Sequence, residues 1–78
     1  MEIEIRLFGI LRNYLPRGRG SSFKKVLEQA VTVKDIIEEL GLPDNIHKVI
    51  VVNGTHPKED YVLQGGDVLS IFPPLAGG

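Results

Sequence analysis

The sequence predicts a small α+β domain in which one helix packs on one face of a mixed sheet of four to five strands. Three patterns in the 78 residues predict it. Residues 2–8 alternate between polar and apolar side chains with a period of two, which is typical of a half-buried strand. Residues 32–40 have a helical period, and the apolar, β-branched stretches 48–53 and 67–72 follow them. No other segment has a comparable helical period, which disfavours a ferredoxin-like sandwich with two helices.

The first half of the chain is expected to form two strands joined by a loop. In the first strand, three apolar side chains point to one face: Ile3, Ile5 and Leu7. A helical turn is expected over 10–15, and the Gly- and Ser-rich residues 17–22 are expected to form a flexible loop. A second strand is expected over 23–29, where the alternation is weaker.

The helix over 32–40 has start and stop signals. The hydroxyl of Thr32 can accept a hydrogen bond from the first turn, and Asp35 can return one to the cap residue. Four apolar side chains form one stripe along the helix: Val33, Ile36, Ile37 and Leu40. Gly41 can adopt the left-handed conformation that ends a helix, and Pro43 prevents its continuation.

Three strands are expected after the helix. Four consecutive β-branched residues within 48–53 predict a strand covered on both faces. Asn53-Gly54 predicts a hairpin turn into a short strand near 55–57, and the last strand is expected over 67–72. Two hairpins packed on one helix, with the first and last strands paired in the middle, define the β-grasp or ubiquitin-like fold, so residues 1–72 are predicted to form one such domain.

The composition excludes several classes of function. The chain has no cysteine, which excludes a disulfide scaffold, a Cys-ligated metal site and a nucleophilic or sulfur-carrying thiol. No apolar run approaches the ~20 residues of a membrane span, and residues 1–4 do not resemble a signal peptide. We therefore expect a cytoplasmic protein without a membrane partner. A chain of this size has little room for a cleft of its own, which favours a binding module, subunit or carrier over an enzyme.

The charge is unevenly distributed although the net charge is only −1. Residues 1–25 hold six basic and two acidic side chains, and the rest of the chain holds three basic and eight acidic ones. The basic group comprises Arg12, Arg17, Arg19, Lys24 and Lys25. It is interpreted as a solvated loop or as a docking surface for an acidic protein. No aromatic residues are interleaved with it for base stacking, so no nucleic-acid partner is expected.

The chain carries no motif for metal binding or phosphate binding. His47 and His56 are nine positions apart and not on one helix, so no metal site is predicted. No Gly-rich phosphate loop is present.

The last six residues are predicted to form an extended, flexible tail over 73–78. Pro73 and Pro74 end the last strand because they lack a backbone N–H, and they favour a stiff, extended conformation. Six extended residues reach on the order of 20 Å. Gly77 and Gly78 have no side chains, so the terminal carboxylate can enter a narrow channel in another protein.

The whole chain resembles the MoaD/ThiS family of sulfur-carrier proteins. The resemblance rests on the closing stretch 65–78 with its Phe-Pro-Pro-x-Ala-Gly-Gly ending, on the hairpin at 51–54, and on Phe8-Gly9 followed by Leu11-Arg12. The di-proline makes it more similar to the small subunit of molybdopterin synthase than to the thiazole-synthesis carrier. The segments 16–22 and 33–37 are also similar to ubiquitin-like domains fused to other proteins, which usually lack the terminal di-glycine.

The resemblance implies a function for the terminal carboxylate. A ubiquitin-activating-type adenylyltransferase would use ATP to adenylate Gly78, and a persulfide donor would then convert the terminus to a thiocarboxylate. The sulfur would pass to a biosynthetic acceptor, such as the precursor of molybdopterin or of a tungsten pterin. The chain itself would be a carrier and not an enzyme, with no bound cofactor.

The resemblance also implies partners and a docking surface. The partners would be the activating enzyme, a larger synthase subunit and a sulfur donor that acts through a partner. The free chain would be a monomer. The implied contact residues are Phe8, Arg12, Leu63, Phe72, Pro73, Pro74, Leu75 and Ala76. Phe8, Leu63 and Phe72 are equally compatible with a place in the core, and Arg12 with simple solvation.

Three other functions remain open from the sequence. The chain could be a protein modifier conjugated to lysines through Gly78, a carrier for thiazole synthesis, or a non-covalent β-grasp interaction domain with an inert tail.

Overall fold

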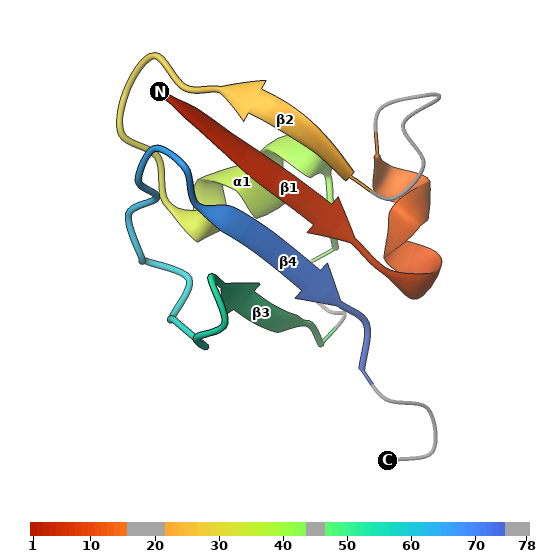
Figure 1. Ribbon diagram of the computed structural model, residues 1–78. Coiled ribbons are helices and arrows are strands. Elements are labelled where there is room, and N and C mark those ends of the chain that lie inside the picture. Colours follow the sequence, from red (N-terminus) through yellow and green to blue (C-terminus); the bar gives the residue numbers. More distant parts are fainter. Residues whose placement is uncertain (16–21, 44–46, 75–78) are drawn as a thin grey trace.

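The computed structural model describes residues 1–15, 22–43 and 47–74. It contains the strands β1 (Glu2–Leu7), β2 (Ser22–Val26), β3 (Val49–Val52) and β4 (Val68–Phe72), the 3₁₀ helix η1 (Gly9–Tyr14) and the α-helix α1 (Val33–Leu40). The sheet order is β2-β1-β4-β3; β1 and β4 are parallel, and the two outer pairs are antiparallel. Figure 1 shows α1 lying across one face of this sheet. The predicted β-grasp fold is therefore confirmed.

The helix begins and ends where the sequence predicts. The Thr32 hydroxyl accepts from the Asp35 N–H at 3.1 Å, and the Asp35 carboxylate accepts from the Thr32 N–H at 2.9 Å, which completes a capping box. Gly41 ends α1 in the left-handed region at φ 79°, and the Leu42 N–H donates to the Ile37 carbonyl. The cap and the stop signal thus fix where α1 begins and ends.

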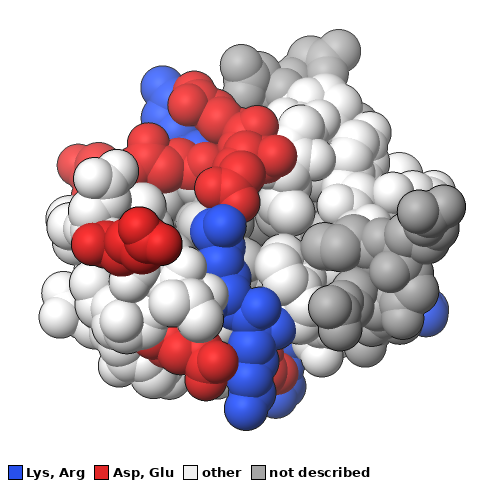
Figure 2. All heavy atoms as spheres, turned by 90° about the horizontal axis from the view of Figure 1, so that it is seen from above, with Lys and Arg blue, Asp and Glu red and all other residues white. Residues whose placement is uncertain are grey.

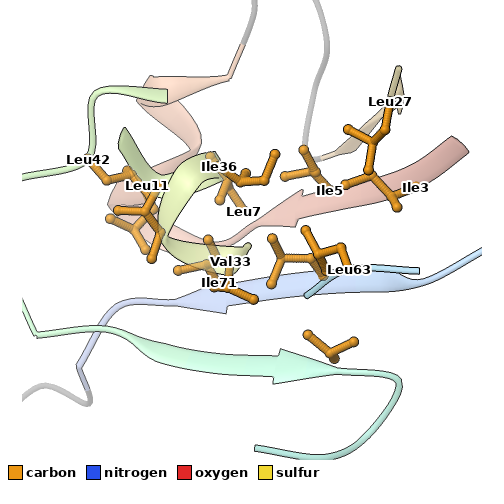
Figure 3. Close-up of a cluster of buried hydrophobic side chains, with 13 residues drawn as sticks. Ile3, Ile5, Leu7, Leu11, Leu27, Val33, Ile36, Leu42, Leu63 and Ile71 are labelled. Carbon is orange, nitrogen blue, oxygen red and sulfur yellow. The ribbon is translucent and has the colours of Figure 1, made fainter. Parts of the chain in front are cut away.

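The hydrophobic core fills the space between α1 and the sheet (Figure 3). Strands β1 and β4 contribute alternate residues to it, and all of these are at most 1% exposed: Ile3, Ile5, Leu7, Leu69 and Ile71. The predicted stripe of α1 supplies three buried side chains, while Leu40 is only partly buried. Because successive strand residues point to opposite faces, the intervening residues of β1 and β4 must lie on the outer face of the sheet.

Three strand predictions are corrected. Strand β3 was expected to be covered on both faces, but it is an edge strand that pairs only with β4, and Val49 is 41% exposed. The short strand expected near 55–57 reduces to a bridge between Val52 and Thr55. Continuing that bridge would place Pro57 opposite Ile50, where proline has no N–H to donate. Strand β2 is also shorter than predicted and ends at Val26.

The part of the chain that the structure describes contains no helix of the length and apolarity that crossing a membrane requires. The loop predicted over 17–22 lies outside the described residues except for Ser22, which begins β2.

Candidate functional site

The candidate site is the end of β4, where the chain leaves the sheet (Figure 1). Phe72 is the last residue of the strand, Pro73 is half-buried and Pro74 is exposed. The remaining predicted tail residues, Leu75, Ala76, Gly77 and Gly78, lie outside the described residues. Their docking and reactive roles, and the division of the chain at 72, stay predictions.

Two aromatic side chains stack at this exit. The rings of Phe8 and Phe72 have their centroids 4.3 Å apart and lie within 10° of parallel. The parallel register pairs Leu7 with Ile71, and the Phe8 N–H donates to the Ile71 carbonyl at 3.2 Å, so the β1–β4 ladder continues to the end of β4. Leu7 and Ile71 are fully buried, which places Phe8 and Phe72 on the opposite, outer face. Both are half-buried there.

Strand β3 extends this apolar surface. Val49 lies beside Phe72 in the register and Val51 lies beside Ser70, and neither valine is fully buried. We call Phe8, Val49, Val51 and Phe72 the outer patch. The two valines were missed as surface residues because four consecutive β-branched residues hide the alternation of an edge strand.

Leu63 does not belong to the outer patch, and the docking role expected for it is wrong. It is 0% exposed and lies in the core with Val33 and Ile71, as Figure 3 shows. Its N–H donates to the Val31 carbonyl at 2.9 Å, so its segment runs beside the start of α1. Leu63 anchors that segment to the core, which leaves no surface for a partner.

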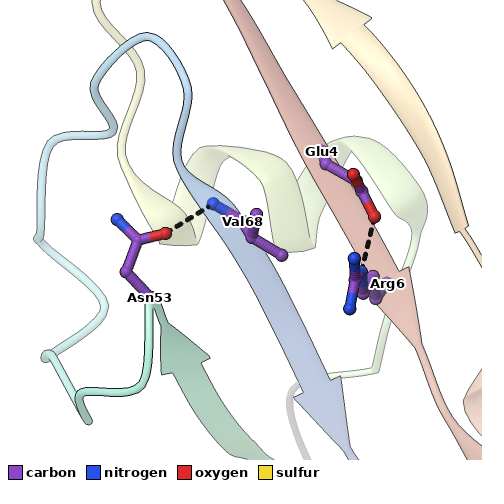
Figure 4. Close-up of polar contacts among 4 residues, drawn as sticks. All are labelled: Glu4, Arg6, Asn53 and Val68. Atoms are coloured by element: carbon purple, nitrogen blue, oxygen red, sulfur yellow. Dashed lines mark hydrogen bonds and ion pairs between the residues drawn. The ribbon is translucent and has the colours of Figure 1, made fainter.

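The basic residues of the first 25 positions do not form one uniform patch in the described chain. Arg12 is exposed on η1, which fits both a place at the rim of a docking surface and simple solvation. Lys25 pairs with Glu39 of α1, and Arg6 pairs with Glu4 along β1 (Figure 4). Figure 2 likewise shows Lys and Arg side chains beside acidic ones. Arg17 and Arg19 lie outside the described residues.

A polar cluster at the start of β4 was not predicted. The buried Asp67 carboxylate accepts hydrogen bonds from the Asn53 side-chain amide at 2.8 Å, the Gln64 N–H at 2.8 Å and the Tyr61 hydroxyl at 3.1 Å. Asn53 in turn accepts from the Val68 N–H at 2.9 Å (Figure 4). Partial burial, together with the hydrogen bond to Asp67 and the charge of that carboxylate, raises the pKa of Tyr61 above its ordinary value of 10.0.

The polar cluster lies at the opposite end of β4 from the outer patch. Its hydrogen bonds join the start of β4 to the turn after β3 and to the loop before β4. Asp67 could have been suspected from the sequence only as an acidic residue that follows two glycines and precedes an apolar strand.

The described residues contain no group of three or more side chains that could hold a metal ion. The described part of the site is an apolar surface beside the point where the chain leaves β4.

One helix on a four-stranded mixed sheet, with its first and last strands parallel at the centre, defines a ubiquitin-like protein of the β-grasp fold. The chain belongs to the Mut7-C ubiquitin family, whose family model matches residues 1–76. A search of the curated proteins found no match.

Solved structures of small ubiquitin-like proteins share this fold. SAMP1 from Haloferax volcanii has a TM-score of 0.75 at 23% identity, with 100% of both chains covered. A putative molybdopterin converting factor, subunit 1, from Pyrococcus furiosus has a TM-score of 0.73 at 24% identity, covering 95% of this chain and 98% of its own.

The third comparison is a complex of subunits 1 and 2 of molybdopterin-converting factor from Helicobacter pylori, with a TM-score of 0.63 at 22% identity and 100% of both chains covered. The predicted resemblance to such small subunits is thus confirmed at the level of the fold.

Proposed function

We propose that this protein is a sulfur carrier whose terminal Gly78 carboxylate is activated and converted to a thiocarboxylate by partner proteins. The observation that carries the proposal is the stacked Phe8–Phe72 pair at the base of a Pro-Pro…Gly-Gly ending. This apolar pair lies where the chain leaves the sheet, which supports the proposal that a partner docks there. A partner that binds the outer patch would therefore receive the terminus in its own active site.

The chemistry would take place on the chain end and in the partner. A Gly78 carboxylate oxygen would attack the α-phosphate of ATP in a ubiquitin-activating-type adenylyltransferase, releasing pyrophosphate. The terminal sulfur of a persulfide would then attack the acyl carbon, and AMP would leave with the C–O bond electrons. A second thiol of the donor would cleave the sulfur–sulfur bond, which leaves one sulfur on Gly78 and a disulfide on the donor.

The partners are proposed from the same surface. A half-buried apolar patch beside a chain end fits a larger subunit that covers the patch and receives the tail. The Helicobacter pylori structure, a complex of subunits 1 and 2 of molybdopterin-converting factor, supports such a two-subunit assembly. In it this chain would act as a non-catalytic small subunit, and a molybdopterin or tungsten-pterin precursor is the acceptor that we propose.

A second candidate function is protein modification through Gly78. It is favoured by the similarity to SAMP1, described in a second structure as small archaeal modifier protein 1. It shares the adenylation step and differs in the acceptor, which would be a lysine amine.

Mass spectrometry separates these proposals. The chain would be incubated with ATP, a persulfide donor and the activating enzyme of its own organism, with a variant lacking Gly78 as the control. A sulfur carrier gains the mass of one oxygen-to-sulfur exchange at Gly78, whereas a modifier appears linked to lysines. An unchanged chain with both ATP and enzyme present would contradict both candidates.

A further inference from the structure

The first residue of η1 touches the first residue of the tail. Gly9 has φ +58°, and a Cβ atom built on it would lie 2.8 Å from Cγ and 3.4 Å from Cδ of Pro73. Two non-bonded carbon atoms cannot lie 2.8 Å apart, so one of the two groups would have to move. The pyrrolidine ring of Pro73 therefore rests directly on the Gly9 backbone, and a side chain at position 9 would displace it.

The residues that precede Gly9 and Pro73 in the chain also contact each other. Phe8 stacks on Phe72, and the Phe8 N–H donates to the Ile71 carbonyl. Each partner in the stack thus directly precedes one partner in the Gly9–Pro73 contact. Two successive contacts, Phe8 with Phe72 and Gly9 with Pro73, therefore hold the chain in place at the end of β4.

The proline ring at position 73 lets these contacts determine the direction of the chain. Its ring fixes φ and its missing N–H ends the ladder, so the chain direction after Phe72 depends on where the ring is seated. With Pro74 next in the chain, the stiffness extends one residue further. A fixed ring therefore sets the direction of the chain at Pro73 and Pro74.

We infer that Gly9 is a positioning residue that seats the Pro73 ring and sets the direction in which the tail leaves the domain. Its consequence for partner binding rests on the proposed function. A tail oriented before binding loses less conformational entropy when it enters a partner. The contact of the Pro73 ring with Gly9, here called the seat, would therefore raise the affinity for that partner.

The seat itself is tested by NMR in the isolated protein, using Gly9→Asn. Asparagine tolerates a positive φ, so the substitution mainly adds the Cβ that meets Pro73. Gly41→Asn is the matched control, because Gly41 has φ +79° and nothing within 4 Å of an added Cβ. The measurement is the set of Cα–Hα residual dipolar couplings of Pro73 and Pro74 in a weakly aligned sample.

In the wild-type protein and in Gly41→Asn, these couplings should fit the alignment of the sheet. In Gly9→Asn, they should fall towards zero or fit a different orientation. Couplings that fit the sheet equally well in all three proteins would overturn the inference.

The consequence for binding is tested with a double-mutant cycle in this chain, formed by Gly9→Asn and Pro73→Ala. The measured quantity is the Kd for the activating enzyme of the same organism. Gly9→Asn should weaken Kd about five- to tenfold, the effect of freeing roughly one residue that the partner must then order. In a Pro73→Ala background it should have little further effect, because the added Cβ would then face only the Cβ of residue 73, 4.0 Å away. Equal losses in both backgrounds, or the same loss in Gly41→Asn, would contradict the inference.

The two arms separate this inference from the proposed function. If the wild-type chain neither binds the activating enzyme nor is adenylated, the proposed function fails. The dipolar couplings still decide whether Gly9 seats Pro73, since they need no partner.

Discussion

Replacing Asp67 by alanine tests whether the polar cluster holds the start of β4. The Asp67 side chain is buried, and its carboxylate accepts three hydrogen bonds, from the Asn53 amide, the Tyr61 hydroxyl and the Gln64 N–H. The alanine variant leaves all three donors without their acceptor. It also removes the partner that keeps Asn53 aligned with the Val68 N–H.

The expected loss follows from these contacts. A hydrogen bond to a charged group contributes about 1.5–3 kcal/mol. Three such bonds do not add in full, because Tyr61 and Gln64 are partly exposed and can bind water, and because the variant no longer buries a charge. We expect the free energy of unfolding to fall by about 2–4 kcal/mol, a large part of the 5–15 kcal/mol typical of a domain.

The assay is urea unfolding followed by circular dichroism. Asp60→Ala is the matched control, since Asp60 is an exposed carboxylate in the same loop, and it should change stability by no more than about 0.5 kcal/mol. A loss below about 0.5 kcal/mol in Asp67→Ala, or equal losses in the two variants, would refute the structural role assigned to the cluster.

Three further predictions concern the pH dependence, the helix cap and the outer patch. Because the pKa of Tyr61 is raised in the folded state, its stabilising contribution should be complete below pH 10.0 and lost as the pH rises through the folded pKa; Tyr61→Phe should remove this dependence in unfolding curves measured at high pH. Thr32→Ala removes the side-chain half of the capping box and should lower the free energy of unfolding by about 1 kcal/mol, and an unchanged urea midpoint would contradict the cap. Phe72→Ala should weaken binding to the activating enzyme about tenfold or more, as measured by calorimetry, because it removes half of the stacked pair; Val62→Ala, at a 44% exposed site outside the outer patch, should leave that affinity unchanged.

Much of the fold could be predicted because local signals and global packing agree. Thr32, Asp35 and Gly41 specify one helix, and the alternation of β1 specifies which face of the sheet meets it. The Asn53-Gly54 pair adopts the positive φ values of a hairpin turn, so the turn after β3 was also predictable.

The predictions for β3 and Leu63 were wrong because the sequence pattern does not show which side chains face the core and which face solvent. Four consecutive β-branched residues fit a buried central strand as well as an edge strand, and only the sheet order shows that Val49 is exposed. Leu63 lies in an irregular segment without a period, so its direction could not be predicted from its neighbours.

The site was partly predictable for the same physical reason. Phe8 directly follows β1 and Phe72 ends β4, and the fold class implies that these two strands pair, so the proximity of the two rings follows from the topology. The Asp67 cluster and the Gly9–Pro73 contact depend on loop geometry that brings distant residues together, and no local pattern encodes it.

The central claim is that the chain carries sulfur on its terminal carboxylate, and thiol-specific alkylation tests it most directly. Because the chain has no cysteine, a thiocarboxylate would be its one thiol-like group. After reaction with the activating enzyme, ATP and a persulfide donor, the purified chain should take up one equivalent of iodoacetamide at Gly78, and a variant lacking Gly78 should take up none. Failure of the activated wild-type chain to take up any label would contradict the account.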